Sequence, residues 1–232
     1  MQLVVAGQFN SFDFLDTYTF DYDLFNLYSA KLMEVMWEDC EPILFAAVGH
    51  TKVEISKNLM KILEAYPVEN IILMGCCGVT SEKIGAIGDV AIADQVYQHD
   101  MMFYSVGYPR TTMPVRGGET SFMEADPWLV DLATKAARSM KQKAHVGTMG
   151  SGDQFVASSK IGAYLLKRYE TKFIDSEGSA ISEIAQNLQY PFVAVKGISN
   201  IVSETGGEQC IVNEPMADCH AGHVVMRMIK MM

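Results

Sequence analysis

Short apolar runs alternate with amphipathic segments along most of the chain. The apolar runs predict strands at residues 2–6, 43–48, 70–74, 90–93, 146–149 and 192–195. The middle runs are apolar throughout rather than alternating, which indicates strands buried on both faces. Apolar positions with helical spacing predict helices at residues 52–66, 127–140, 161–169, 180–188 and 219–232. This order predicts an α/β fold with three α/β/α layers, a mixed central β-sheet and a single domain over residues 1–232.

The segment from residue 9 to residue 28 allows two interpretations. It is rich in aromatic residues and Asp and contains no basic residue. Alternation of Phe20, Tyr22 and Leu24 with polar neighbours favours a strand or a hairpin. The same composition also suits a lid over an apolar pocket, and both interpretations stay open.

Residues 172–200 form a predicted β–α–β unit. One apolar run ends in Asp175, Ser176 and Glu177, a helix follows, and a second apolar run leads to Asn200. We expect the two strands to be parallel, and open α/β sheets bind ligands beyond the carboxyl ends of such strands. The unit therefore predicts a site with a carboxylate, Glu177, and an amide, Asn200.

Each of these side chains also has an ordinary structural explanation. Glu177 is placed to complement the dipole of the helix that follows it, and Asn200 is placed to close a turn. Residues 75–78 read as a tight turn of small residues. Phe155 supplies an aromatic ring near the end of another predicted strand. Together, a carboxylate for sugar hydroxyls, an amide for a heterocycle edge and a stacking ring predict one pocket.

Composition and charge narrow the choice of partners. The 232 residues include 18 basic and 28 acidic side chains, a net charge of −10, so we expect no nucleic-acid binding. We expect no membrane span and no signal peptide, because the apolar runs are short and the start lacks a basic region. Five cysteines without CxxC spacing favour free thiols in a cytoplasmic protein.

Several common motifs are missing from the sequence. It contains neither GxGxxG nor a Walker A motif, so dinucleotide and nucleoside triphosphate sites are not expected. No serine lies in a GxSxG elbow, although His99-Asp100 looks like half of a triad. The scattered histidines do not have the spacing of metal ligands. We therefore expect no cofactor and no metal.

A set of short motifs resembles the nucleoside phosphorylase/nucleosidase superfamily, and in particular the bacterial 5′-methylthioadenosine/S-adenosylhomocysteine nucleosidases. The motifs occur in the family's order over almost the whole chain. They are VVAG at 4–7, GHTKV at 49–53, GCCG at 75–78, IGDV at 87–90, HD at 99–100, SGDQF at 151–155, DSEGSA at 175–180 and GISN at 197–200.

The resemblance implies a homodimer that hydrolyses the N-glycosidic bond of 5′-substituted adenosines, in methionine salvage. It implies that Phe155 stacks on the purine and the Val156 backbone bonds its edge. Glu177 holds the ribose hydroxyls and Asn200 lies at the purine N7. The remaining substrate-binding positions that it implies are Ser176, Cys77, Gly78, Phe103, Val106 and the region of Val212, with the partner subunit completing the 5′ site.

Two positions depart from the family pattern. The family has an acidic Asp where this chain has Asn200, and an amide can donate a hydrogen bond to N7 but not a proton. The family also has a water-activating Glu where this chain has Phe12. Asp13 or Asp16 would replace it only after a shift of the loop, and Asp13 is our candidate.

These departures leave other activities open. An amide at position 200 suits a 6-oxopurine nucleosidase of the futalosine or inosine kind. A purine nucleoside phosphorylase would not need the missing base. Phosphorylases of this superfamily, however, use arginines in their early loops, and the first arginine of this chain is Arg110. A nucleoside-binding homologue with impaired catalysis is the third alternative.

Overall fold

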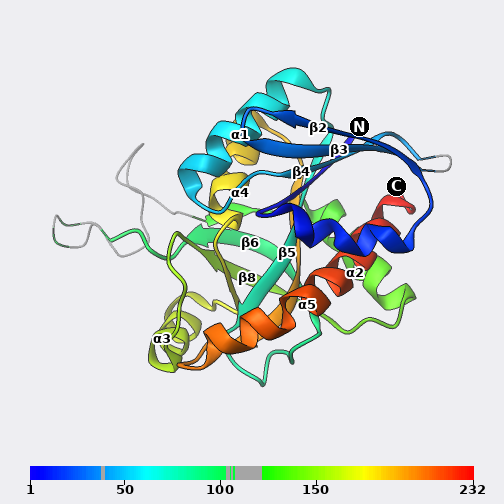
Figure 1. The fold of residues 1–232 in the computed structure, drawn as a ribbon. Coiled ribbons are helices and arrows are strands. Elements are labelled where there is room, and N and C mark those ends of the chain that lie inside the picture. Colours follow the sequence, from blue (N-terminus) through cyan, green and yellow to red (C-terminus); the bar gives the residue numbers. More distant parts are fainter. Residues whose placement is uncertain (38–39, 103–104, 106, 108–121) are drawn as a thin grey trace.

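The computed structural model describes residues 1–37, 40–102, 105, 107 and 122–232 of the chain. Strands and helices alternate along it, as the apolar pattern predicts (Figure 1). The strands are β1 (Gln2–Ala6), β2 (Asp21–Leu27), β3 (Ala30–Met36), β4 (Ile43–Ala47), β5 (Asn70–Val79), β6 (Val90–Gln98), β7 (Phe122–Glu124), β8 (Ala144–Ser151), β9 (Phe173–Asp175) and β10 (Phe192–Ile201). The helices are the 3₁₀ helix η1 (Phe9–Thr17) and the α-helices α1 (Lys52–Ala65), α2 (Pro127–Ser139), α3 (Ser159–Tyr169), α4 (Gly178–Leu188) and α5 (Gly206–Ile229).

All ten strands belong to one mixed sheet. Its order is β10-β6-β8-β9-β5-β1-β4-β3-β2, with β7 beside β6. An additional pairing of β10 with β5 closes the first five strands into a ring. The predicted mixed sheet is thereby confirmed. The expected parallel direction of the strands before and after α4 is wrong, because β5 is antiparallel to β9 and parallel to β10.

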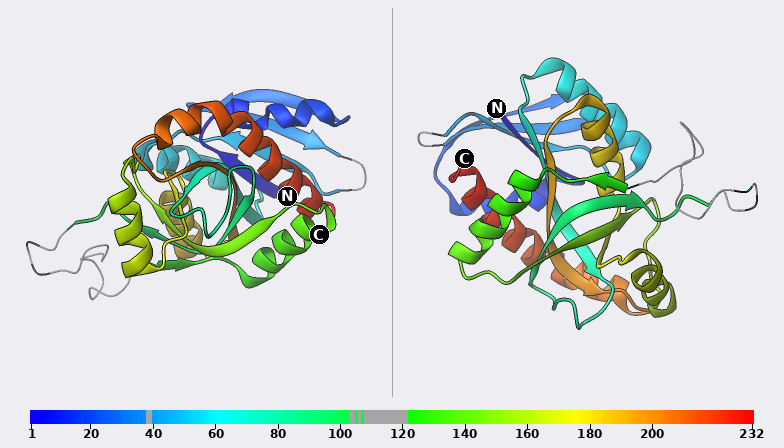
Figure 2. Two further views of the ribbon diagram at one scale, coloured as in Figure 1. Left: turned by 90° about the horizontal axis from the view of Figure 1, so that it is seen from below. Right: turned by 180° about the vertical axis from the view of Figure 1, so that it is seen from behind.

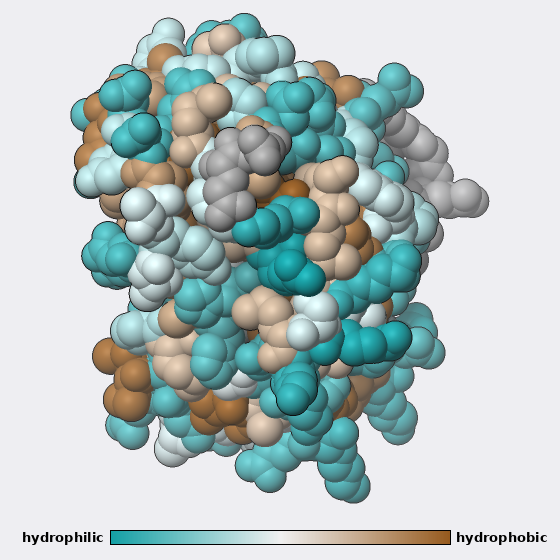
Figure 3. Space-filling model, turned by 90° about the vertical axis from the view of Figure 1, so that its right-hand side faces the viewer, coloured by the Kyte–Doolittle hydropathy of each residue, from teal (hydrophilic) through white to brown (hydrophobic). Residues whose placement is uncertain are grey.

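Two apolar cores lie on opposite faces of the sheet. Helices α1 and α4 cover one face, where Ile55, Leu59 and Ile181 are fully buried. Helices α2 and α5 cover the other face together with η1, where Val224 and Met228 are fully buried (Figures 1 and 2). The layers predicted from the sequence follow from these two cores. On the face that Figure 3 shows, hydrophilic residues surround smaller hydrophobic areas, as expected for a strongly charged chain.

Strand β5 is longer than the sequence predicts. The segment Gly75-Cys76-Cys77-Gly78, expected to be a turn, continues the strand to Val79. Gly78 pairs with Asn200 of β10 on one side and with Ile174 of β9 on the other. The two strand ends that carry the candidate residues therefore meet across β5, although they run in opposite directions.

Helix α5 also begins earlier than predicted, at Gly206 rather than at residue 219. It contains Pro215, whose missing amide hydrogen makes the segment resemble a loop in sequence. The helix crosses β10 closely: a Cβ atom on Gly197 would collide with the backbone carbonyl of Ala217. Despite its 24 residues, α5 is not apolar enough to cross a membrane, and neither is any other helix of the described ranges.

The aromatic segment at residues 9–28 folds into two parts. In η1, Phe12, Phe14 and Leu15 are buried against the core beneath α5. Strand β2 then forms a hairpin with β3, and β3 itself is a strand that the sequence analysis did not predict. The hairpin interpretation is therefore confirmed for β2, while η1 packs into the core.

Candidate active site

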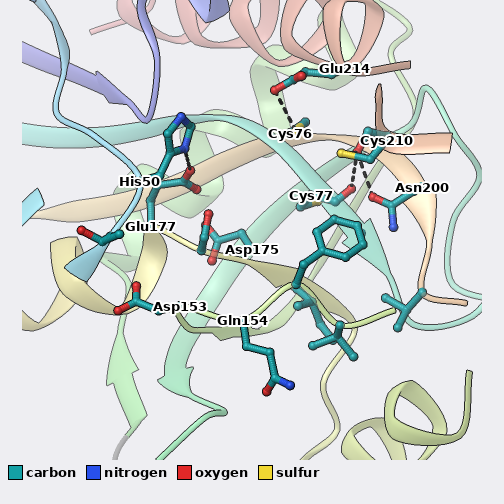
Figure 4. A pocket seen from close by; sticks show the side chains of 18 residues that line it. His50, Cys76, Cys77, Asp153, Gln154, Asp175, Glu177, Asn200, Cys210 and Glu214 are labelled. Carbon is teal, nitrogen blue, oxygen red and sulfur yellow. Dashed lines mark hydrogen bonds and ion pairs between the residues drawn. The ribbon is translucent and has the colours of Figure 1, made fainter. Parts of the chain in front are cut away.

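A cavity of about 360 Å³ opens where β5, β9, β10 and the start of α5 meet. This size is typical of a small-molecule site. Figure 4 shows the side chains that surround it. The lining residues are His50, Thr51, Cys76, Cys77, Gly78, Asp153, Gln154, Phe155, Val156, Ile174, Asp175, Ser176, Glu177, Ser199, Asn200, Val202, Cys210 and Glu214.

One side of the cavity, here called the charged side, consists of Asp175, Glu177, Lys196 and His50. The Lys196 ammonium lies 2.8 Å from Glu177 Oε2 and 3.3 Å from Asp175 Oδ2, and all three side chains are buried. His50 Nδ1 lies 3.4 Å from the other oxygen of Glu177. Glu177 is thus fixed by two contacts on its two oxygens.

Charge pairing decides the ionisation of this group. Burial alone would raise the pKa of Glu177, but the Lys196 charge and the hydrogen bonds from His50 and Lys196 hold it far below its usual value. Burial opposes the charge on Lys196, yet attraction to Glu177 and Asp175 raises its pKa above the ordinary lysine value. Burial raises the pKa of Asp175. Glu177 is therefore a permanent anion that accepts hydrogen bonds and does not serve as a base near neutral pH.

The opposite side, here called the neutral side, consists of Phe155, Val156, Ser199, Asn200 and Val202. The Ser199 hydroxyl lies 3.0 Å from Asn200 Oδ1, and Asn200 Nδ2 has only a long contact of 3.4 Å to the Ile201 carbonyl. The amide nitrogen is therefore available to donate a hydrogen bond into the cavity. Phe155 is 56% exposed and lines the same cavity.

Cys76, Cys210 and Glu214 line the cavity between the two sides (Figure 4). The neighbouring Cys210 and burial both raise the pKa of the Cys76 thiol, so Cys76 is protonated at neutral pH. The hydrogen bond from Cys76 lowers the pKa of Cys210 to about 7. The Cys76 thiol also lies 3.9 Å from Glu214 Oε1, and Cys210 accepts a hydrogen bond of 3.6 Å from the Ser199 hydroxyl.

The structure brings most of the predicted site residues to this one cavity: Cys77, Gly78, Phe155, Val156, Ser176, Glu177 and Asn200. Asp13 and Asp16 do not line it, since both are exposed on η1. Phe12 is buried and packs its ring against Phe45.

The residues expected around the 5′ substituent are placed less completely. Phe103 and Val106 lie outside the described residues. Val212 is 77% exposed on α5 and does not line the cavity.

Sequence reasoning missed Lys196, His50, Cys210 and Glu214. A signal for Lys196 was present, because a lone charge inside the apolar run of β10 requires a buried partner. Glu214 gave no comparable signal, since it precedes Pro215 in a segment that did not read as a helix.

The geometry defines the chemistry that the cavity can accommodate. A fixed carboxylate accepts hydrogen bonds from hydroxyl groups, and an amide N–H donates to a ring nitrogen or carbonyl. An exposed aromatic ring adjacent to the amide offers a stacking surface. The arrangement fits a planar heterocycle on the neutral side joined to a polyol on the charged side.

Comparisons with known proteins find relatives of this chain. The family model described as "Phosphorylase superfamily" matches residues 15–229. A 5′-methylthioadenosine/S-adenosylhomocysteine nucleosidase of Bacillus pumilus is 25% identical over 208 residues, 88% of this chain and 87% of its own. An aminodeoxyfutalosine nucleosidase of Helicobacter pylori is 24% identical over 165 residues, 71% of this chain and 69% of its own.

Among solved structures, the fold matches that of a Helicobacter pylori nucleosidase variant in which one Asp is replaced by Asn and 5′-methylthioadenosine occupies the active site. The TM-score is 0.92 at 20% identity, with 100% of this chain and 99% of the other covered.

Proposed function

This chain belongs to the phosphorylase superfamily, and from that premise we propose that it is a purine nucleosidase that hydrolyses the N-glycosidic bond of 5′-substituted adenosines. The observation that carries the proposal is the placement of Glu177 and Asn200 across one cavity (Figure 4), which Phe155 also lines. Relatives with nucleosidase activity on adenosine derivatives and on aminodeoxyfutalosine support the reaction class.

In the proposed complex the purine stacks on Phe155 and its edge bonds to the backbone of Val156. The ribose hydroxyls donate to Glu177, with Ser176 next to them. Asn200 Nδ2 donates to N7. The small residues Cys77 and Gly78 allow the sugar and the base to approach β5 closely.

The mechanism follows from charge separation. Cleavage of the C1′–N9 bond leaves positive charge on the ribose and negative charge on the purine. The permanent anion of Glu177 stabilises the ribosyl cation, and the Asn200 amide stabilises negative charge at N7. Preorganised groups of this kind, in a site shielded from water, lower the barrier most where charge develops.

One observation favours a second candidate substrate class. The Ser199 hydroxyl lies 3.0 Å from Asn200 Oδ1, which turns the amide nitrogen toward the cavity. A donor in this place suits N7 and O6 of a 6-oxopurine, whereas the amino group of adenine requires an acceptor. A 6-oxopurine nucleosidase of the futalosine or inosine kind is therefore the alternative.

Hydrolysis is favoured over phosphorolysis by the charges at the cavity. Among the described lining residues there is neither Arg nor Lys. The buried Lys196 behind the lining is already paired with two carboxylates. A phosphate dianion would meet Asp153, Asp175, Glu177 and Glu214, and His50, the one potential cation among the described lining residues, already contacts Glu177, so water is the better nucleophile here.

We also propose a homodimer whose partner completes the 5′ end of the site. Ile211 and Val212 are each 77% exposed near the N-terminal end of α5, close to the cavity. Exposed aliphatic side chains next to a site are typical of an interface. Light scattering of an Ile211→Asp variant tests this, and a wild-type monomer would contradict it.

Chromatography of a nucleoside panel, with and without phosphate, tests the function. The panel contains methylthioadenosine, S-adenosylhomocysteine, futalosine and inosine. We expect base release without phosphate and a loss of about 10–100-fold in kcat/KM for Glu177→Gln, the size of a hydrogen bond to a charged group. Glu64→Gln on the surface of α1 is the matched control. Unchanged activity of Glu177→Gln would contradict the site, and phosphate-dependent release would contradict hydrolysis.

A further inference from the structure

Glu214 extends from α5 into the cavity. It lies in the third turn of the helix and lines the pocket next to Cys76 (Figure 4). Its Oε1 accepts a hydrogen bond of 2.7 Å from Gln8 Nε2 and lies 3.9 Å from the Cys76 sulfur. Both contacts are made by the same oxygen, so Oε2 stays available for a further partner.

The other cavity carboxylates have different partners. Asp175 and Glu177 are ion-paired with Lys196. Asp153 accepts a hydrogen bond of 2.9 Å from the Lys52 backbone amide. Within the described part of the chain, Glu214 has an amide and a thiol as partners and no ion pair. It thus differs from Asp175 and Glu177 in having neutral hydrogen-bond partners.

No residue of η1 can take the role of a base in this cavity. Phe12 is buried, and Asp13 and Asp16 are exposed away from the lining. The raised pKa of Cys76 keeps that thiol protonated, so it serves as a hydrogen-bond donor rather than a nucleophile. Glu214 is the carboxylate that lies between the charged side and the neutral side, where the C1′–N9 bond of a bound nucleoside would be.

We propose that Glu214 is the general base that activates the attacking water, an inference that rests on the proposed nucleosidase function. Water donates one proton to Glu214 Oε2 as its oxygen forms the new bond to C1′. The C1′–N9 bond breaks, and its electron pair goes to the purine. The purine takes a proton from solvent after release, and Glu214 returns its proton to solvent.

The test compares Glu214→Gln with Glu208→Gln, the same change at an exposed position of the same helix. Loss of a general base costs about 10²–10⁴-fold in rate. We expect kcat to fall by at least 100-fold for Glu214→Gln with KM within threefold of wild type, and Glu208→Gln to match wild type. In Glu214→Ala, sodium formate is expected to raise kcat at least tenfold above the value without formate, because formate fits the vacated space and accepts the proton.

Formate rescue separates catalysis from positioning. Glu177→Gln has its base intact and is not expected to respond to formate. A Glu214→Gln variant within threefold of wild type, a loss confined to KM, or a Glu214→Ala variant without rescue would overturn the proposal. Should Glu214→Gln not fold, Glu214→Asp withdraws the carboxylate by one methylene, and an unchanged kcat in that variant would overturn the proposal equally.

The experiment distinguishes this failure from failure of the proposed function. If wild type releases base and Glu177→Gln does not, while Glu214→Gln is unaffected, only the assignment of Glu214 fails. If wild type releases no base from any nucleoside, or releases it only with phosphate, the hydrolytic function fails and the assignment of Glu214 fails with it.

Discussion

The two sides of the cavity are built from different interactions. On the charged side, Lys196 ties Asp175 and Glu177 together through buried ion pairs. On the neutral side, Asn200 is oriented by the Ser199 hydroxyl and by a long contact to the Ile201 carbonyl, and Phe155, Val156 and Val202 beside it are apolar. A change on the charged side leaves a buried charge without a partner, whereas an isosteric change on the neutral side alters one hydrogen bond. In the proposed complex, the charged side therefore holds the sugar, and the neutral side is where specificity can vary.

The largest effect is expected from removing the cation of the charged side. Lys196→Met leaves the buried Asp175 and Glu177 without the cation that they share, and such losses cost about 3–5 kcal/mol of folding free energy. Denaturant unfolding followed by circular dichroism measures it. Lys135→Met removes an exposed lysine paired with Asp131 and is expected to cost less than about 1 kcal/mol. Equal effects of the two changes would show that the charged side is not held by Lys196.

An exchange on the neutral side is expected to alter turnover without unfolding the protein. Asn200→Asp supplies an acid that can protonate N7, so hydrolysis of methylthioadenosine should rise about 100-fold at mildly acidic pH. Turnover of 6-oxopurine nucleosides should fall, because the amide donor to O6 is lost. Asn187→Asp, at an exposed position of α4, serves as control. If Asn200→Asp destabilised the protein as much as Lys196→Met, the two sides would not differ as described.

Asp218 is a buried acid that has no ion pair among the residues that the structure describes. Burial raises its pKa from the ordinary 3.8 to about 6. Its ionisation therefore disfavours the folded state, by nothing below pH 3.8 and increasingly up to about pH 6. Asp218→Asn should raise the free energy of unfolding by on the order of 1–3 kcal/mol at pH 7.5.

The same variant should show no gain near pH 4, where the acid is protonated in both states. Unfolding at the two pH values measures the difference, and Asp131→Asn, an exposed change, should be neutral at both. A gain that did not depend on pH would rule out ionisation as its cause.

The smallest effect is expected for His50, at the exposed edge of the charged side. The hydrogen bond with Glu177 raises the pKa of His50, so its stabilisation is full below pH 6.5 and disappears as pH rises through the higher folded-state value. The side chain is 58% exposed, which limits the contribution to about 0.5 kcal/mol. His50→Ala should lower the melting temperature slightly at pH 5.5 and not at pH 8.5. A loss of equal size at both values would indicate packing rather than charge.

The sequence alone predicted the site residues that follow a local pattern. It did not predict the residues whose position depends on contacts between segments far apart in the chain. Glu177 and Asn200 follow apolar runs, which is a local signal. Cys76 and Cys77 read as a turn because glycines flank them, yet pairing with Gly197 and Ile198 of β10 keeps them in a strand. The start of α5 was missed because Pro215 disfavours a helix locally, while packing against β10 and η1 stabilises one. Glu214 reaches the cavity only because of that packing.

The crossing of α5 over β10 at Gly197 and Ala217 has a consequence for redesign. Asn200 lies three residues after Gly197 on the strand, and Glu214 lies three residues before Ala217 on the helix. The crossing therefore sets the positions of both residues, which in the proposed complex are the amide that faces the base and the carboxylate next to it. A larger side chain at position 197 would collide with the backbone of Ala217 and displace the helix from the strand, and Asn200 and Glu214 would then move relative to each other. Libraries that aim to change base preference should keep glycine at position 197 and vary only positions 200 and 214.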